Sequence, residues 1–134
     1  MKLRFPACSI AAGKRVERGL TIMDMTGGGI GTANKQVYGL IKLAAKVGSD
    51  YYPEIMGNLY IVNAPFLFAG IWSMIKSFID EKTRAKIKII GGSFIPTMLE
   101  NVDRDKLPVF LGGDCTCGGT KEKPLCMTSN AGPW

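Results

Sequence analysis

The sequence predicts an α/β domain with a mostly parallel sheet and helical crossovers. Short β-prone segments alternate along the chain with segments whose apolar residues recur at helical spacing. The segment over residues 58–63 is nearly all apolar in its middle, which is typical of a strand covered on both faces. With 134 residues, 46% of them apolar, the chain has the size and composition of one globular domain at most.

The first half of the chain supplies two strands and a helix between them. Residues 7–14 are expected to end a helix, and residues 18–25 to form the first strand. A glycine cluster at residues 27–31 follows, after which Thr32 can cap a helix that ends at Gly48. That helix has an apolar face and a lysine face: Val37, Leu40, Ile41 and Ala44 against Lys35, Lys42 and Lys46.

The second half continues the alternation. Strands are expected over residues 58–63, 85–90 and 107–111, and helices over residues 66–79 and 95–101. From Asp114 onward the chain is rich in glycine and polar residues, and we expect it to be irregular. Because only a helix tail precedes the first strand, we expect the sheet to be incomplete and the chain to be a fragment or short form.

Composition argues against several classes of function. The net charge is +6, but the 17 Lys and Arg residues are spread along the chain, so we predict no nucleic-acid arm. The chain has no histidine, which removes the usual general base, the Ser–His and Cys–His nucleophile pairs and most zinc sites. We therefore expect no catalytic residues and no cofactor.

The chain has four cysteines: Cys8, Cys115, Cys117 and Cys126. The last three are close in sequence, but their spacing does not fit a four-ligand zinc site. No apolar signal segment precedes them, so a reduced, cytosolic chain is the default expectation. We predict free thiols and no metal.

The glycine cluster at residues 27–31 follows a strand and precedes a helix, which is the context of a phosphate-binding loop. Its spacing, however, matches neither GxxxxGK[ST] nor GxGxxG. A flexible strand-to-helix turn is favoured, and a nucleotide-binding enzyme is the alternative.

The predicted helix over residues 66–79 is unusually apolar. Its only polar residues are Ser73, Lys76 and Ser77. Such a helix is normally buried on nearly all sides, which a domain of this size provides with difficulty. It is either a core helix or a lid that lines a ligand cavity and touches a membrane, and composition alone favours the core.

Three polar residues lie at or just before the starts of predicted strands: Glu54 before the second strand, and Thr83 and Lys86 around the start of the third. Together they could hold a polyol phosphate, with Lys86 supplying charge and Thr83 and Glu54 binding hydroxyls. Each is equally well explained as a surface residue, because spacing does not show that they meet.

Five short segments of the chain together form a recognisable pattern: FPACS at 5–9, LTIMD at 20–24, YYPE at 51–54, YIVNAPF at 60–66 and GPW at 132–134. With these segments the chain resembles the CRAL-TRIO domain of phosphatidylinositol/phosphatidylcholine transfer proteins. The resemblance covers essentially the whole chain, residues 1–134, as one partial domain. It implies that a first strand and an N-terminal helical lobe are missing.

The resemblance also implies a function. Such domains hold one phospholipid with its acyl chains in an apolar pocket and exchange phosphatidylinositol for phosphatidylcholine between membranes, without catalysis. A cytoplasmic protein peripheral to Golgi or endosomal membranes is implied. The helix over residues 66–79 becomes the gate helix, which turns the balance from core toward lid. Its gate and pocket-lining residues are Phe66, Phe68, Ile71, Trp72, Ile75, Phe78 and Ile79.

By the same resemblance, Glu54, Thr83 and Lys86 bind the phosphatidylinositol head group and Thr21 binds the phosphatidylcholine head group. Gly19 stands where the family has a hydroxyl residue of the phosphatidylcholine site, so the second ligand could be another hydrophobic molecule. Lys88 is a separate departure, at a position where the family tends to be apolar. A different interpretation is a lipid sensor or membrane-docking module without transfer activity.

Overall fold

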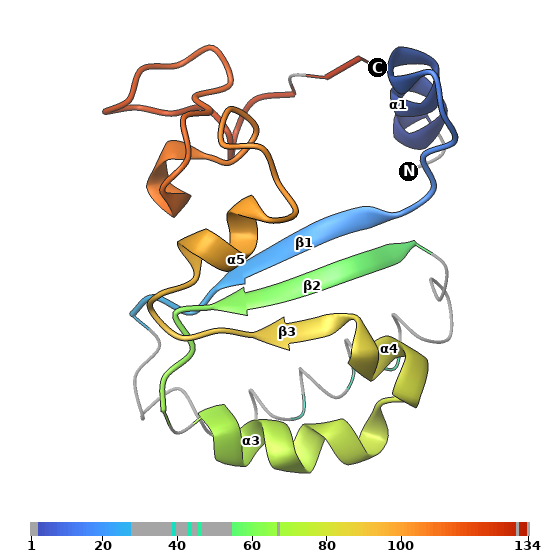
Figure 1. Ribbon diagram of the computed structural model, residues 1–134, viewed down its shortest axis with the longest axis vertical. Helices are drawn as coiled ribbons and strands as arrows, with labels where there is room; N and C mark the ends of the chain where they lie inside the picture. Colours follow the sequence, from blue (N-terminus) through green and yellow to red (C-terminus); the bar gives the residue numbers. More distant parts are fainter. Residues whose placement is uncertain are drawn as a thin grey trace. The chain divides into compact units, whose positions relative to one another are not determined.

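The computed structural model describes residues 3–27, 39, 43, 46, 55–66, 68–130 and 132–133. The chain divides into two compact units (Figure 1). One unit, Glu17–Gly92, contains the sheet. The other joins Met1–Val16 to Ser93–Trp134 and contains short helices and a long irregular segment.

The sheet has three parallel strands in the order β1-β2-β3: Gly19–Asp24, Met56–Val62 and Ile87–Ile89. Thr21 pairs with Leu59, and Leu59 pairs with Ile87, so these residues form one row across the sheet. In the central strand, Tyr60, Ile61 and Val62 are buried, as the apolar run in the sequence predicts. The predicted parallel sheet and its first three strands are confirmed, although β3 is shorter than expected.

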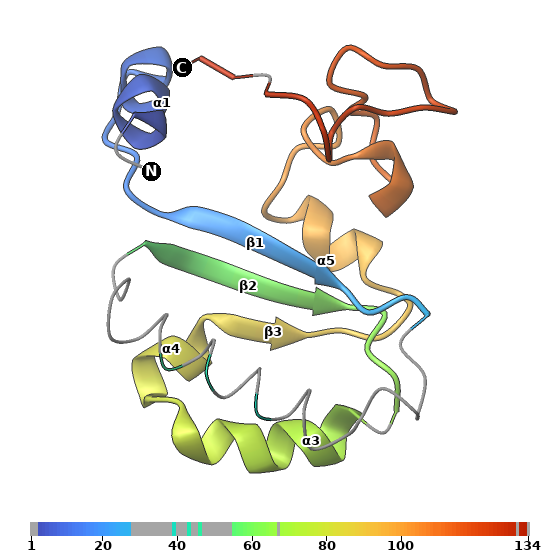
Figure 2. The same ribbon diagram turned by 180° about the vertical axis from the view of Figure 1, so that it is seen from behind.

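The segment between β2 and β3 contains three helical pieces: α3 (Phe68–Ile75), the 3₁₀ turn η2 (Lys76–Phe78) and α4 (Glu81–Ala85). Both views show α3 and α4 beside β3, on the side away from β1 (Figures 1 and 2). The prediction of one continuous helix over residues 66–79 is therefore wrong at both ends.

Local hydrogen bonds explain where this helix begins and ends. Phe66 lies in a turn before α3, and the Phe68 N–H donates to the Pro65 carbonyl at 2.8 Å. At the other end, the Ser77 hydroxyl donates to the Met74 carbonyl at 2.7 Å. In a continuing α-helix that carbonyl would accept from the residue four positions later, so the chain tightens into a 3₁₀ turn instead.

The strand predicted over residues 85–90 is also corrected at its start. Asp80 caps α4 by accepting a hydrogen bond from the Thr83 N–H at 2.9 Å, and Ala85 is the last residue of that helix. Lys86 forms the C-cap, so it lies outside β3 and does not share a strand face with Lys88.

The second unit contains α1 (Arg4–Ala12), α5 (Ile95–Leu99) and the 3₁₀ turn η3 (Val109–Leu111). The predicted N-terminal helix and the short helix near residue 95 are confirmed, and α1 ends at Gly13, whose φ is 62°. Met98 and Leu107 are fully buried in this unit.

The strand predicted over residues 107–111 is wrong, because only an isolated bridge joins Pro108 to Cys115. Proline has no N–H to give to a ladder, and the chain then turns at Gly112, whose φ is 82°. The described residues after Asp114 contain no helix or regular strand, as expected.

The predicted helix after Thr32 lies outside the described residues, except for Gly39, Leu43 and Lys46, which are helical. Most of the glycine cluster lies outside them too. None of the described helices is long and apolar enough to cross a bilayer.

Gly113 provides a test of packing in the second unit. A Cβ at this position would lie 1.9 Å from the Leu107 carbonyl oxygen, whereas a Cβ at Gly92 would meet nothing within 4 Å. We expect Gly113→Ala to lower the free energy of unfolding by roughly 3 kcal/mol, because backbone rather than a flexible side chain must move. Gly92→Ala is the matched control and should change it little. Urea denaturation followed by circular dichroism measures both, and equal stability of the two variants would contradict the packing described here.

Candidate functional site

Helix α3 carries large apolar side chains on two sides. Phe68 and Ile75 are buried, and Ile71 and Trp72 are half-buried. Phe66 just before the helix, Met74 within it and Phe78 in η2 are 95%, 59% and 58% exposed. Residues seven apart lie on the same side of a helix, so Phe68 and Ile75 form an inner face.

Three large apolar side chains are therefore exposed between residues 66 and 78. Single exposed apolar residues are ordinary, but several within one short stretch of chain favour contact with an apolar partner or phase. The sequence left core and lid as alternatives for this helix. The structure shows that it is packed on one face and carries exposed apolar side chains elsewhere.

Helix α4 brings together two of the predicted head-group residues. Lys86 caps the helix one turn after Thr83, and its N–H donates to the Thr83 carbonyl at 3.1 Å. The Lys86 carbonyl accepts from the Leu59 N–H at 2.9 Å, which ties the end of α4 to the central strand. Both side chains are half-buried. The backbone around this pair is therefore held by the helix on one side and by the sheet on the other.

Asp80 orients the other end of α4. Hydrogen bonds from the Thr83 hydroxyl and the Thr83 N–H hold the pKa of the Asp80 carboxyl below its usual value. The sequence analysis missed this short helix. The signal was present, because Asp80 is a favoured N-cap, Glu81 is acidic in the first turn, and Lys82 and Arg84 are basic in the last.

The other two residues predicted to bind a head group, Glu54 and Thr21, belong to segments at the amino-terminal edge of the sheet. Glu54 lies outside the described residues, but the next residue, Ile55, accepts a hydrogen bond from the Gly19 N–H at 2.8 Å, where β1 and β2 start. Thr21 is exposed and lies in the row that contains Ile87. Two strand spacings, about 10 Å, separate residues at the two ends of that row. Thr21 and Lys86 thus lie near the amino-terminal edge but do not adjoin.

Lys88 pairs with the central strand rather than with the head-group residues. Its ammonium lies 5.6 Å from the centre of the Tyr60 ring, its register partner, in a cation–π contact. The Tyr60 side chain is fully buried, and its hydroxyl has no hydrogen-bond partner among the described residues.

A polar network joins the carboxyl ends of β1 and β2. The Asp24 carboxylate accepts from the Thr26 hydroxyl at 2.6 Å, from the Thr26 N–H at 2.9 Å and from the Asn63 amide at 2.9 Å. These bonds favour the charged form, with the Thr26 hydroxyl having the largest effect, and lower the pKa of Asp24. Asn63 has a φ of 53°, a conformation that Asn tolerates better than most residues. The network fixes where both strands end.

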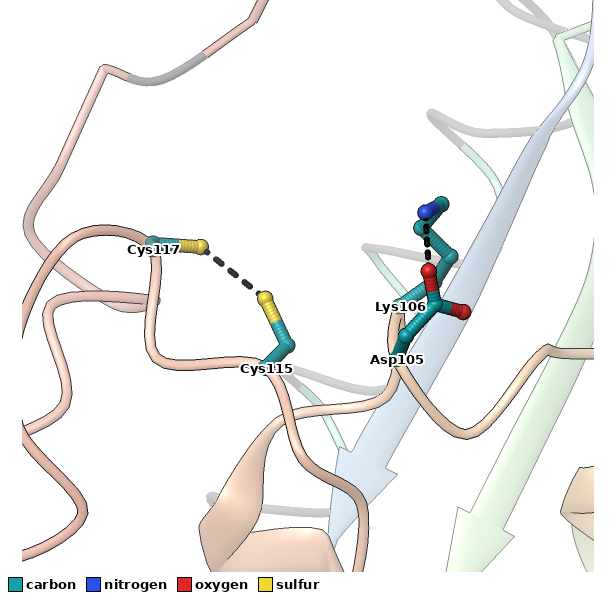
Figure 3. A network of polar contacts seen from close by, with 4 residues as sticks. All are labelled: Asp105, Lys106, Cys115 and Cys117. Atoms are coloured by element: carbon teal, nitrogen blue, oxygen red, sulfur yellow. Dashed lines mark hydrogen bonds and ion pairs between the residues drawn. The ribbon is translucent and has the colours of Figure 1, made fainter.

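Three thiols gather in the irregular segment of the second unit. The Sγ atoms of Cys115 and Cys117 are 3.4 Å apart and point toward one another, as Figure 3 shows. The Sγ atom of Cys126 is 3.9 Å from that of Cys115 and also donates to the Cys115 carbonyl at 3.2 Å. The sequence analysis missed this cluster, because it searched for a four-ligand pattern.

The thiols differ in acidity. The hydrogen bond from Cys117 lowers the pKa of Cys115, with a smaller contribution from the charge of Lys106. Loss of hydration on burial raises the pKa of Cys126 to about 12. Lys106 itself forms an exposed ion pair with Asp105, also drawn in Figure 3.

Comparison with known proteins gives a consistent result. Residues 6–113 match the CRAL/TRIO domain. The chain is 46% identical over 131 residues to Sec14 cytosolic factor of Schizosaccharomyces pombe, covering 98% of the chain and 44% of that protein. It is 43% identical over 132 residues to phosphatidylinositol/phosphatidylcholine transfer protein SFH12 of Arabidopsis thaliana, covering 98% of the chain and 24% of that protein.

The fold is also found among solved structures. The chain matches the crystal structure of Sfh5 with a TM-score of 0.66 and 20% identity, over 90% of the chain and 40% of that structure. At this identity the likeness shows the fold alone. The chain spans less than half the length of each of these relatives.

The Asp24 network makes the stability of the chain depend on pH. Thr26→Val removes the hydroxyl donor but keeps the shape of the side chain, so the pKa of Asp24 should rise toward its ordinary value, as measured by NMR titration of the carboxyl. Because the folded-state pKa is lowered, the stabilisation is present above the ordinary carboxyl pKa and is lost as pH falls through the lowered one.

The urea midpoints of the original chain and Thr26→Val should therefore differ most near neutral pH and converge in acid. Thr21→Val, in β1, is the control and should leave the pKa of Asp24 unchanged, because the three donors to this carboxylate come from Thr26 and Asn63. An unchanged pKa in Thr26→Val would refute the role given to this hydroxyl.

Proposed function

The chain belongs to the CRAL/TRIO domain family, and on that basis we propose that it binds a phospholipid and carries it between membranes. Phosphatidylinositol is the first ligand of this proposal, and phosphatidylcholine or another hydrophobic molecule is the ligand exchanged for it. Several similar proteins of Arabidopsis thaliana bear the name phosphatidylinositol/phosphatidylcholine transfer protein, which supports both ligands. In this proposal residues 1–134 serve one lipid-binding domain.

The observation that carries the proposal is the distribution of apolar side chains around α3. Exposing an acyl chain to water has an unfavourable free energy of about 0.8 kcal/mol for each CH₂ group. A carrier must therefore cover the chains during transit and still touch the bilayer when it loads them. A helix that packs on its inner face and exposes Phe66, Met74 and Phe78 elsewhere suits both tasks.

We accordingly assign α3 and its flanking residues to a gate over the acyl chains. The residues proposed to form the gate or line the pocket are Phe66, Phe68, Ile71, Trp72, Ile75, Phe78 and Ile79. The turn at Pro65 before the helix and the 3₁₀ turn after it are the points at which this segment would swing.

The head group is proposed to bind at the end of α4. Lys86 would pair with the phosphate that joins the inositol ring to the rest of the lipid, and Thr83 and Glu54 would bind hydroxyls of the same head group. The hydrogen bond from Leu59 to the Lys86 carbonyl supports this assignment, because it fixes the Lys86 backbone before any ligand arrives. Thr21 is proposed to contact the phosphatidylcholine head group.

The proposed activity is that of a carrier, in which no bond of the lipid is made or broken. We place it in the cytoplasm, in peripheral contact with Golgi or endosomal membranes. The relative from Schizosaccharomyces pombe is named a cytosolic factor, which supports the first part of this assignment.

Lys86 tests the head-group assignment. With vesicles that contain labelled phosphatidylinositol or phosphatidylcholine, Lys86→Ala should lower phosphatidylinositol transfer by about 10-fold or more, because a hydrogen bond to a charged group contributes about 1.5–3 kcal/mol. Phosphatidylcholine transfer should change by less than about 2-fold, since Lys86 is not proposed to contact that head group. Lys82→Ala removes the same charge from an exposed position of α4 and is the matched control.

Each outcome of this assay bears on the proposal. Equal transfer of phosphatidylinositol by Lys86→Ala and Lys82→Ala would refute the role of Lys86. Vesicle binding by the unaltered chain without exchange of either lipid would refute transfer and favour a lipid sensor or membrane-docking module.

A further inference from the structure

The three thiols of Cys115, Cys117 and Cys126 have no part in the proposed lipid site. They lie beyond residue 113, where the match to the CRAL/TRIO domain ends. In the described part of the chain, they are the one group of three or more metal-ligating side chains whose ligand atoms are close enough to share an ion, all within 4.8 Å of one another. Three converging sulfurs exceed the two that a disulfide uses.

The distances between the sulfurs agree with metal coordination. A Zn–S bond is about 2.3 Å long, so two thiolates at tetrahedral angles lie about 3.8 Å apart. The Cys115–Cys117 and Cys115–Cys126 sulfur pairs are 3.4 Å and 3.9 Å apart. Small side-chain rotations would make these separations equal around a central ion.

The conformation of the loop between Cys117 and Cys126 brings the three sulfurs together. Cys117 has a φ of 50° and Gly118 a φ of 86°, so the chain turns back immediately after the first two thiols. The Gly119 and Leu125 N–H groups both donate to the Thr116 carbonyl, at 3.0 Å and 2.9 Å. This closes the loop and returns the chain to Cys126.

The start of the cluster is held equally firmly. The Cys115 N–H donates to the Leu107 carbonyl at 2.9 Å, and the Cys115 carbonyl accepts from the Val109 N–H at 3.1 Å. A side chain at Gly119 would place its Cβ 2.3 Å from the Lys123 carbonyl, so the loop requires glycine there. Positive φ at a residue other than glycine costs energy, and such conformations concentrate at functional sites.

We propose that Cys115, Cys117 and Cys126 bind one thiophilic metal ion, Zn²⁺ or Cu⁺, through three thiolates. On binding, each thiol releases one proton, so three protons leave for each ion bound. Thiolates select these soft ions over Mg²⁺ and Ca²⁺. The chain has no histidine, and no carboxylate of the described residues joins the three sulfurs, so a fourth position would be filled by water or an external ligand, or left open in three-coordinate Cu⁺. The ion would join the loop at both of its ends.

Titration of the reduced, metal-free chain with Co²⁺ as a probe for the zinc site tests this proposal. Thiolate coordination should give a saturable sulfur-to-cobalt charge-transfer band in the near ultraviolet at one equivalent, and Zn²⁺ should bleach it. Cys117→Ser and Cys126→Ser should each weaken binding by at least about 10-fold, the loss that even changes outside the first ligand shell can cause. Cys8→Ser, in α1, is the control and should leave the titration unchanged.

A second readout needs no variant, so a misfolded variant does not leave the question open. Zn²⁺, or Cu⁺ added with a competing chelator, should protect the three clustered thiols of the unaltered chain from alkylation, as mapped by peptide mass spectrometry. Cys8 should be alkylated to the same extent with and without metal. Protection by Cu⁺ alone would assign the site to three-coordinate copper, and protection by Zn²⁺ would assign it to zinc.

Two results would overturn the proposal. One is the lack of saturable binding and of protection with all three ions. For the other, the protein is equilibrated with equimolar Zn²⁺ in a buffer of reduced and oxidised glutathione. Formation of a Cys115–Cys117 disulfide under these conditions, with no metal bound, would overturn the proposal.

Discussion

Burial of the central strand β2 is the constraint from which both parts of the proposed lipid site follow. Tyr60, Ile61 and Val62 are buried, and the strand is paired on both sides. Its carboxyl end passes through Pro65 into α3, and its Leu59 N–H holds the carbonyl of Lys86 at the end of α4. The proposed gate and the proposed head-group residues are therefore attached to the same strand, so loss of pairing in β2 would displace both.

Helix α3 and its flanking residues combine buried and exposed apolar side chains. Its inner side chains Phe68 and Ile75 contribute to the core, whereas Phe66 and Met74 leave apolar surface in contact with water. Such surface favours aggregation unless something apolar covers it part of the time. A lipid or a bilayer supplies that cover in the proposed function. In that proposal the short turns at either end are the points at which the helix would move as an intact unit relative to the strand.

The sequence predicted the alternation of strands and helices well, because apolar periodicity reflects burial directly. It failed where single side-chain hydrogen bonds decide an end. Ser77 ends the α-helical part of residues 66–79. Asp80 starts a short helix that the sequence analysis missed, and this helix delays the start of the strand expected from residue 85. It also failed at residues 107–111, where an apolar run resembles a strand, but Pro108 and the turn at Gly112 prevent a ladder. Such local competition is not visible in a periodicity of 2.0 or 3.6 residues.

The two candidate sites also differ in how far the sequence alone could predict them. Residues Thr83 and Lys86 could be paired from their spacing alone once a helix was recognised there, but the hydrogen bond from Leu59 to Lys86 depends on the register of the sheet. The thiol cluster depends on backbone geometry, since the positive φ of Cys117 and the closed loop after it bring Cys126 back. A search for ligand spacings finds sites whose loops are regular, and this loop is not.

The central claim is that this chain holds a phospholipid beneath α3. Native mass spectrometry of the purified chain tests it most directly, because it detects a ligand that is taken up during expression and retained. The account predicts a population of chains heavier by the mass of one phospholipid, which tandem fragmentation identifies as phosphatidylinositol or phosphatidylcholine. Bare chain alone, with no lipid acquired after incubation with vesicles of both phospholipids, would contradict it.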